Sequence, residues 1–233
     1  AIFERDKVFS AEMLLKAEWR KEEEYWKQKS RVQWLQSGDK NSAYFHATTI
    51  QRRQRNRIVG LEDRNGQWSE DGKKVEEIIL DYFGDIFNSS NPLDFDSVLN
   101  TVSLKVTEMM NRRLLMAPTT EEIKAAAFQI HPSKCPGPDG MTASFFQNYW
   151  HIVGSDIVNV VRSFFHSGIL LRSINYTHIA LIPKVASPMN MSHLRPISLC
   201  TVSYKIIAKT LANRLRYALS SIVSPNQSAF VPG

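Results

Sequence analysis

Hydrophobic side chains recur at the three- and four-residue spacing of amphipathic helices along most of this chain. The segments with this spacing are residues 5–50, 70–88, 119–130, 143–167 and 203–222. In the first segment, Ser37, Gly38 and Asp39 predict a break. In the last, the predicted apolar stripe consists of Ile207, Leu211, Leu215 and Leu219. The chain is therefore expected to be mostly helical.

Two regions depart from this spacing and predict short strands. An Asn-Gly pair at Asn65 and Gly66 supplies the positive φ angles of a tight turn, so residues 58–68 predict a β-hairpin. Residues 178–183 and 193–199 are short, apolar and limited by prolines, which predicts two strands joined by a loop. This arrangement would bring Lys184 and Arg195 near one another. The expected fold class is α+β, mostly helical.

Local signals also predict helix ends. Thr119 and Glu122 have the spacing of a capping box, in which the two side chains satisfy free amide groups at a helix start. Gly168 stands where a helix commonly ends in the left-handed conformation. The aromatic and aliphatic side chains between residues 143 and 167 are expected to form core. Residues 91–117 show weak periodicity and predict a linker or mobile region.

Composition narrows the class of partner. The chain has 29 Lys and Arg against 23 Asp and Glu, a net charge of +6, which suits an anionic partner without requiring one. Its apolar stretches fall short of the ~20 residues of a membrane span, so we expect no membrane partner and a nuclear or cytoplasmic location. Cys135 and Cys200 are interpreted as free thiols, and no metal-binding spacing is present.

Two basic patterns suggest nucleic-acid binding, and each has a simpler alternative. The first consists of Arg52, Arg53, Arg55 and Arg57. It is either a phosphate-contacting patch or a solvated helix end. The second consists of Lys205, Lys209 and Arg216, which share one face of the last predicted helix. These residues either face a nucleic-acid backbone or are simply solvated.

An unusual loop at residues 134–141 alternates two prolines with two glycines. Its members are Lys134, Cys135, Pro136, Gly137, Pro138, Asp139, Gly140 and Met141. Such a loop is either a plain turn or a backbone surface built for close approach. Asp139 is expected to fix the loop by accepting hydrogen bonds from nearby backbone amides.

Several blocks, in order, resemble the fingers side of the reverse transcriptases of non-LTR retrotransposons, of the LINE kind common in plants. The blocks are residues 134–141, Leu181-Ile-Pro-Lys184, His193-Leu-Arg-Pro-Ile-Ser-Leu199, residues 204–215 and Gln227-Ser-Ala-Phe-Val-Pro-Gly233. Residues 26–88, including Gly38-Asp-Lys-Asn41, resemble the segment that precedes the polymerase in those elements. The resemblance covers about nine-tenths of the chain, and the order of the blocks makes it specific.

The resemblance implies roles for particular residues. Lys184 and Arg195 would approach the triphosphate of the incoming nucleotide, with Arg195 the better candidate. Lys134, Pro136, Gly137, Pro138, Asp139 and Gly140 would form a loop on the template side. The implied partners are an RNA template, a DNA primer and a deoxynucleoside triphosphate; the oligomeric state stays open.

The resemblance also implies what the chain lacks. Family polymerases hold two Mg²⁺ ions on palm aspartates, and these 233 residues contain no Asp-Asp pair. We therefore expect no catalytic residue, no metal site and no bound cofactor here, with Mg²⁺ bound only in a full-length family member. We also expect the upstream endonuclease domain to be absent.

The expected organisation is a helical N-terminal extension over residues 1–90, a linker over 91–117 and a truncated fingers region over 118–233. This would be an incomplete polymerase right hand whose palm is missing. Two further hypotheses stay open: a stand-alone nucleic-acid-binding protein and a retroelement relic without function.

Overall fold

The computed structural model describes residues 2–30, 42–91, 93 and 95–223. These residues form two compact units, one comprising residues 1–83 and 181–195 and the other comprising residues 84–180 and 196–233. Two predicted features lie outside the described residues: the break at Ser37–Asp39 with the adjoining block to Asn41, and the block at Gln227–Gly233. Among the described helices, none combines the length and apolar character needed to cross a membrane.

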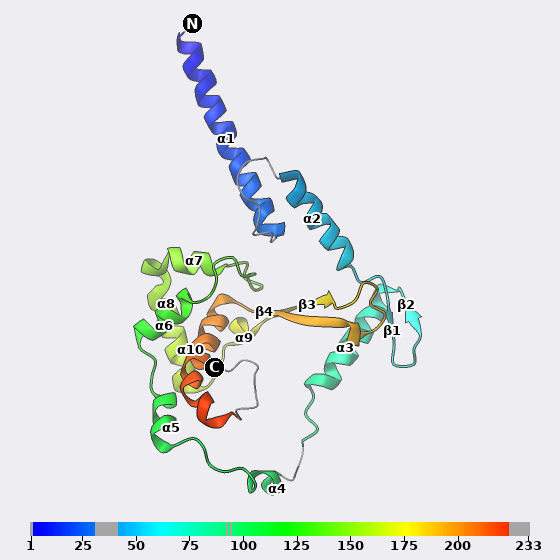
Figure 1. Ribbon diagram of the computed structural model, residues 1–233, viewed down its shortest axis with the longest axis vertical. Helices are drawn as coiled ribbons and strands as arrows, with labels where there is room; N and C mark the ends of the chain where they lie inside the picture. Colours follow the sequence, from blue (N-terminus) through cyan, green and yellow to red (C-terminus); the bar gives the residue numbers. More distant parts are fainter. Residues whose placement is uncertain (1, 31–41, 92, 94, 224–233) are drawn as a thin grey trace. The chain divides into compact units, whose positions relative to one another are not determined.

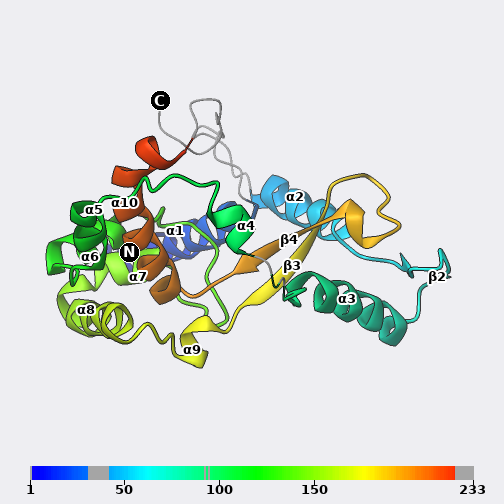
Figure 2. The same ribbon diagram turned by 90° about the horizontal axis from the view of Figure 1, so that it is seen from below.

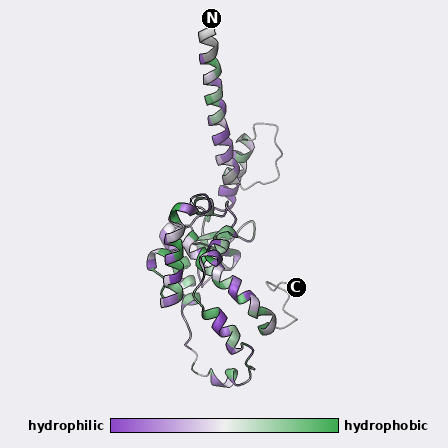
Figure 3. Ribbon diagram, turned by 90° about the vertical axis from the view of Figure 1, so that its left-hand side faces the viewer, coloured by the Kyte–Doolittle hydropathy of each residue, from purple (hydrophilic) through white to green (hydrophobic). Residues whose placement is uncertain are grey.

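The first unit begins with two helices. Helix α1 spans Ile2–Ser30 and helix α2 spans Ser42–Arg55, in agreement with the helical spacing (Figure 1). The Trp26 and His46 rings join the two helices edge to face, with centroids 4.4 Å apart. Hydrophilic and hydrophobic residues are mixed along α1 (Figure 3), and its large apolar side chains at positions such as Leu14 and Trp19 are exposed.

The predicted hairpin is confirmed. Strands β1 (Leu61–Glu62) and β2 (Trp68–Ser69) are antiparallel, with Leu61 opposite Ser69. Of the Asn-Gly pair, only Gly66 has a positive φ, +76°, a conformation that glycine adopts without strain. The Asp63 carboxylate accepts hydrogen bonds from the amides of Asn65 and Gln67, at 2.8 and 2.9 Å, and so fixes the turn.

A small core holds the first unit together. Helix α3 (Gly72–Phe87) packs its apolar face, which includes Val75, Ile78 and Tyr82, against buried Leu61. Buried Met191 and Leu194 complete this core from the later segment of the chain. The amide of Glu62 donates to the Met189 carbonyl at 2.7 Å, which fastens the hairpin to that same segment.

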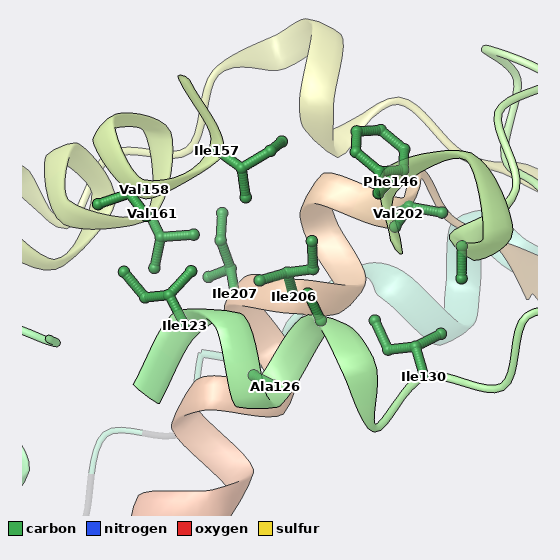
Figure 4. Packing of buried hydrophobic residues seen from close by; sticks show 12 residues of the cluster. Ile123, Ala126, Ile130, Phe146, Ile157, Val158, Val161, Val202, Ile206 and Ile207 are labelled. Atoms are coloured by element: carbon green, nitrogen blue, oxygen red, sulfur yellow. The ribbon is translucent and has the colours of Figure 1, made fainter. Parts of the chain in front are cut away.

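The second unit is a helical cluster. Its elements are α4 (Asp96–Leu99), α5 (Glu108–Leu115), α6 (Thr120–Phe128), α7 (Ala143–Asn148), α8 (Trp150–Ser167), α9 (Arg172–Asn175) and α10 (Val202–Ile222). Ile123 of α6, Val161 of α8 and Ile206 of α10 are fully buried and meet at its centre (Figure 4). The expected core between residues 143 and 167 is largely confirmed, although Tyr149 is 49% exposed.

Helix ends follow the local signals. The Thr119 hydroxyl accepts the Glu122 amide at the start of α6, and Gly168 closes α8 with φ of +68°. Residues 91–117 contain the short helices α4 and α5, and Thr107 caps α5.

Strands β3 (His178–Pro183) and β4 (Leu194–Leu199) form the second predicted strand pair. They run side by side (Figure 2), and the boundary between the two units falls within both strands. A short 3₁₀ turn, Met191–His193, leads into β4. The mostly helical α+β class is thus confirmed.

The predicted apolar stripe of α10 is wrong in part. Leu211 and Leu215 are 37% and 45% exposed, whereas Ile206 and Thr210 are fully buried. Thr210 can occupy the core because its hydroxyl donates to the Ile206 carbonyl at 2.9 Å and is therefore satisfied within the helix. The buried face is thus rotated away from the row of leucines.

Candidate nucleic-acid interface

The arginine cluster lies at the end of α2. Arg52, Arg53 and Arg55 occupy the last turn of α2, and Arg57 follows it. All four side chains are exposed, and none has a hydrogen-bond or ion-pair partner within the described part of the chain. Positive charge here also complements the negative end of the helix dipole, which is the simpler role. The structure therefore presents four exposed guanidinium groups over six positions, without partners among the described residues.

Lys184 directly follows β3 and Arg195 lies in β4, but the two differ in their surroundings. The Lys184 ammonium donates to the Ser192 carbonyl at 2.8 Å, and its backbone amide donates to the His193 carbonyl at 2.8 Å. Lys184 therefore helps to close the loop between the strands. Arg195 is exposed and has no side-chain partner among the described residues. Of the two predicted nucleotide ligands, Arg195 is the one whose side chain makes no bond to the rest of the described structure.

The loop at residues 134–141 contains a tight turn. The Gly140 amide donates to the Gly137 carbonyl at 3.1 Å, with Pro138 and Asp139 between them, and Gly140 has φ of +70°. The Asp139 carboxylate accepts the Met141 amide at 3.1 Å, as the sequence suggests. Because this carboxylate serves the loop's own backbone, Asp139 acts as a fixing residue.

The same loop approaches the start of α10 very closely. A β-carbon on Gly137 would lie 2.5 Å from the Thr201 nitrogen and 2.6 Å from the Cys200 carbonyl carbon. Only glycine fits at this contact. The Lys205 ammonium, from the first turns of α10, donates to the Cys135 carbonyl at 2.7 Å. The close backbone approach that the sequence suggests for this loop is therefore made to the start of the chain's own helix α10.

This contact changes the interpretation of the basic face of α10. Lys205 is half-buried, and this burial lowers the pKa of its ammonium because desolvation disfavours the charged form. Cys200 and the Asp139 carboxylate act in the opposite direction. Lys209 is half-buried and Arg216 is exposed. Of the three, Arg216 is the cation most open to solvent.

Arg214 is a central residue that the sequence interpretation missed. Its guanidinium forms two hydrogen bonds to the Glu122 carboxylate, at 2.6 and 2.9 Å, and its side chain is only 11% exposed. It also donates to the Leu114 and Met116 carbonyls at the end of α5, and it lies 5.0 Å from the Phe165 ring centroid. Arg214 therefore ties α5, α6, α8 and α10 together.

The ion pair shifts the pKa of Glu122. The hydrogen bonds from Arg214 lower the pKa of this carboxyl, and partial burial opposes them. The signal available in the sequence was one arginine among leucines on a predicted helix, which does not identify a partner 92 positions away.

Among the described residues, no group of three or more His, Cys, Asp or Glu side chains is arranged to hold a metal ion.

Comparison with known proteins identifies relatives over most of the chain. It is 30% identical over 207 residues, 88% of its length, to the Transposon TX1 uncharacterized 149 kDa protein of Xenopus laevis. It is 24% identical over 159 residues, 67% of its length, to the Retrovirus-related Pol polyprotein from type-2 retrotransposable element R2DM of Drosophila melanogaster. No protein-family profile matches it.

The chain spans only 16% and 14% of the lengths of these two relatives. Both relatives are proteins of transposable elements. The chain is therefore homologous, over most of its length, to proteins of non-LTR, LINE-type retrotransposons.

Proposed function

We propose that this chain forms the part of a non-LTR reverse transcriptase that approaches the RNA template, the DNA primer and the incoming nucleotide. The order of the sequence blocks supports the polymerase assignment. In this proposal the two-unit structure is the N-terminal extension and fingers of a polymerase right hand.

One observation carries the binding part of the proposal: the side chains of the arginine cluster at the end of α2 are exposed and have no partner in the described part of the chain. Four guanidinium groups within six positions suit closely spaced phosphate oxygens, which accept paired hydrogen bonds from such groups. Each phosphate neutralised on a single strand contributes about 0.7 to the slope of log affinity against log salt. Contact with three or four phosphates would therefore contribute a slope of about 2 to 3.

The test is the binding of a fluorescent RNA template annealed to a DNA primer, measured by anisotropy between about 50 and 200 mM salt. Replacing Arg52, Arg53, Arg55 and Arg57 with Gln should reduce the slope by about 2. The matched control replaces four other exposed cations with Gln: Lys73, Lys74, Lys105 and Arg112. Equal slopes in the two variants would show that net charge, rather than the arginine cluster, binds the nucleic acid.

For the incoming nucleotide we propose Arg195 as the phosphate ligand. A guanidinium can orient the polyphosphate of a nucleotide and neutralise its charge. With template and primer present, Arg195→Ala should weaken binding of a deoxynucleoside triphosphate about tenfold. Lys184→Ala should have a smaller effect, because its ammonium is committed to the Ser192 carbonyl. A larger loss with Lys184→Ala would reverse this assignment.

We further propose that residues 1–233 alone do not polymerise. The sequence contains no Asp-Asp pair of the kind that holds catalytic metal ions. Primer extension on an RNA template with Mg²⁺ and all four deoxynucleotides tests this proposal. Sustained incorporation by the purified chain would refute it.

A further inference from the structure

A hollow of about 590 Å³ lies within the second unit. Its wall is formed by the end of α3, the segment around α9, the strands β3 and β4 and the start of α10. The residues that matter here are Arg172, Asn175, Tyr176, Thr177, Ser198 and Tyr204. This volume falls in the range of small-molecule sites, about 300 to 1,000 Å³.

The wall of the hollow is rich in hydrogen-bond donors and lacks acids. None of its nine lining residues is Asp or Glu. The Arg172 guanidinium and the hydroxyl groups of Ser198 and Tyr204 have no hydrogen-bond or ion-pair partner among the described residues. A guanidinium without a carboxylate beside it favours an anion.

Two tyrosines give the hollow an aromatic side. Tyr176 is 59% exposed and meets the His178 ring edge to face, with centroids 5.5 Å apart. Tyr204 stands in the first turn of α10 and is half-buried. Exposed aromatic faces are the surfaces on which nucleic-acid bases stack.

The two sides of the hollow are fixed to each other by Thr201, which is 6% exposed. Its hydroxyl donates to the Ile174 carbonyl of α9 at 3.1 Å and accepts the Tyr204 amide at 3.2 Å. The first bond holds the α9 segment beside the start of α10, and the second caps α10. Such a preformed site spends less binding energy on ordering its side chains.

We infer that this hollow binds one nucleotide unit, with its phosphate at Arg172 and its base against Tyr176 or Tyr204. The combination of one cation, several neutral donors and aromatic rings matches the charge and the ring of a nucleotide. The site shares no residue with the arginine cluster, Lys184 or Arg195, so this inference does not depend on the proposed function.

The experiment is calorimetric titration of the 233-residue chain with adenosine 5′-monophosphate, adenosine and inorganic phosphate. The monophosphate should bind at least about tenfold more tightly than adenosine or phosphate, because only it engages Arg172 and the rings together. Arg172→Ala should weaken the monophosphate about tenfold, and Arg112→Ala, which removes an exposed charge elsewhere in the same unit, should change it less than about twofold.

Two tyrosine variants test the aromatic side. Tyr176→Ala should weaken binding about tenfold, whereas Tyr176→Phe, which keeps the ring, should bind like the parent chain. Circular dichroism of each variant verifies folding, which Arg172→Ala should preserve because Arg172 lies exposed without a partner in the described structure.

Three results would overturn the inference: no binding of the monophosphate, phosphate binding as tight as the monophosphate, or no effect of Arg172→Ala. Competition with a single-stranded oligoadenylate shows whether the bound nucleotide unit belongs to a strand or is free. Tighter binding of the oligomer would assign the site to a nucleic-acid strand, and tighter binding of the monophosphate would assign it to a free nucleotide. The variant lacking the arginine cluster should still bind the monophosphate. If the monophosphate does not bind while the salt dependence of template–primer binding stays as proposed, this inference fails and the proposed function stands.

Discussion

Replacing Arg214 with Met is the sharpest perturbation of the second unit. Methionine keeps much of the length and apolar volume of arginine but removes every hydrogen bond of the guanidinium. The variant leaves Glu122 without its ion-pair partner and leaves the Leu114 and Met116 carbonyls without this donor.

The magnitude follows from burial. The Arg214 side chain is 11% exposed and that of Glu122 is 29% exposed, so water replaces the lost bonds incompletely. Breaking one side of a buried ion pair costs about 3–5 kcal/mol. Because Glu122 keeps partial access to water, we expect a loss near the lower limit, about 3 kcal/mol in the free energy of unfolding.

Urea unfolding followed by circular dichroism measures this loss. Arg216→Met is the matched control, since Arg216 is exposed and should change stability by less than about 0.5 kcal/mol. The double variant Arg214→Met with Glu122→Gln should lose less than the two single losses combined, because the pair is broken only once. A loss below about 1 kcal/mol for Arg214→Met, or additive losses, would refute the reasoning.

Three further predictions concern the same unit. Arg214 lowers the pKa of Glu122 in the folded state, so the stabilisation from this carboxylate is present above its unfolded pKa of about 4.3 and is lost as pH falls through the lower folded pKa. The difference in stability between the parent chain and Glu122→Gln should therefore shrink as pH falls from 7 to below 4. A constant difference in urea unfolding would contradict this. Gly137→Ala should destabilise the protein by about 1–3 kcal/mol, because the added β-carbon would overlap the backbone at Thr201. The control Gly84→Ala should be neutral or stabilising, because its β-carbon meets nothing within 4 Å. Equal melting temperatures for the two variants would argue against the close contact. Asp139→Asn should cost less than about 1 kcal/mol, since an amide oxygen can still accept the Met141 amide, and it should leave Mg²⁺ titrations unchanged; loss of specific Mg²⁺ binding would contradict the role of Asp139 in fixing the loop.

Local chemistry made much of the fold predictable. Gly66 determines a turn through its positive φ, and Thr119 and Gly168 mark helix ends through bonds made within a few residues. The sequence needs no distant partner to specify these features. They were predicted correctly for that reason.

Features that depend on distant partners were not predicted. The row of Leu211 and Leu215 looks more hydrophobic than the face with Thr210, but the packing of α6 and α8 decides which face is buried. Arg214 acquires its role only when Glu122, 92 positions earlier, is brought beside it. The join between the hairpin and Met189 likewise crosses more than a hundred residues.

The candidate site was predictable to a similar degree. Exposure of the arginine cluster follows from its position at a helix end. The difference between Lys184 and Arg195 does not follow from sequence, because it arises from a carbonyl that the loop at Ser192 happens to present. The bond from the Lys205 ammonium to the Cys135 carbonyl was likewise not predictable, because it forms only when the loop at residues 134–141 packs against α10.

Photocrosslinking tests the central claim most directly, that this chain lies along the template and primer of a reverse transcriptase. An RNA template carrying 4-thiouridine at successive positions, annealed to a DNA primer, would be irradiated with the 233-residue chain, and the crosslinked peptides would be mapped by mass spectrometry. We expect crosslinks in the peptide that contains Arg52 to Arg57, at template positions that shift in register with the label. Crosslinks spread evenly over exposed lysines and arginines, or absent from that peptide, would contradict it.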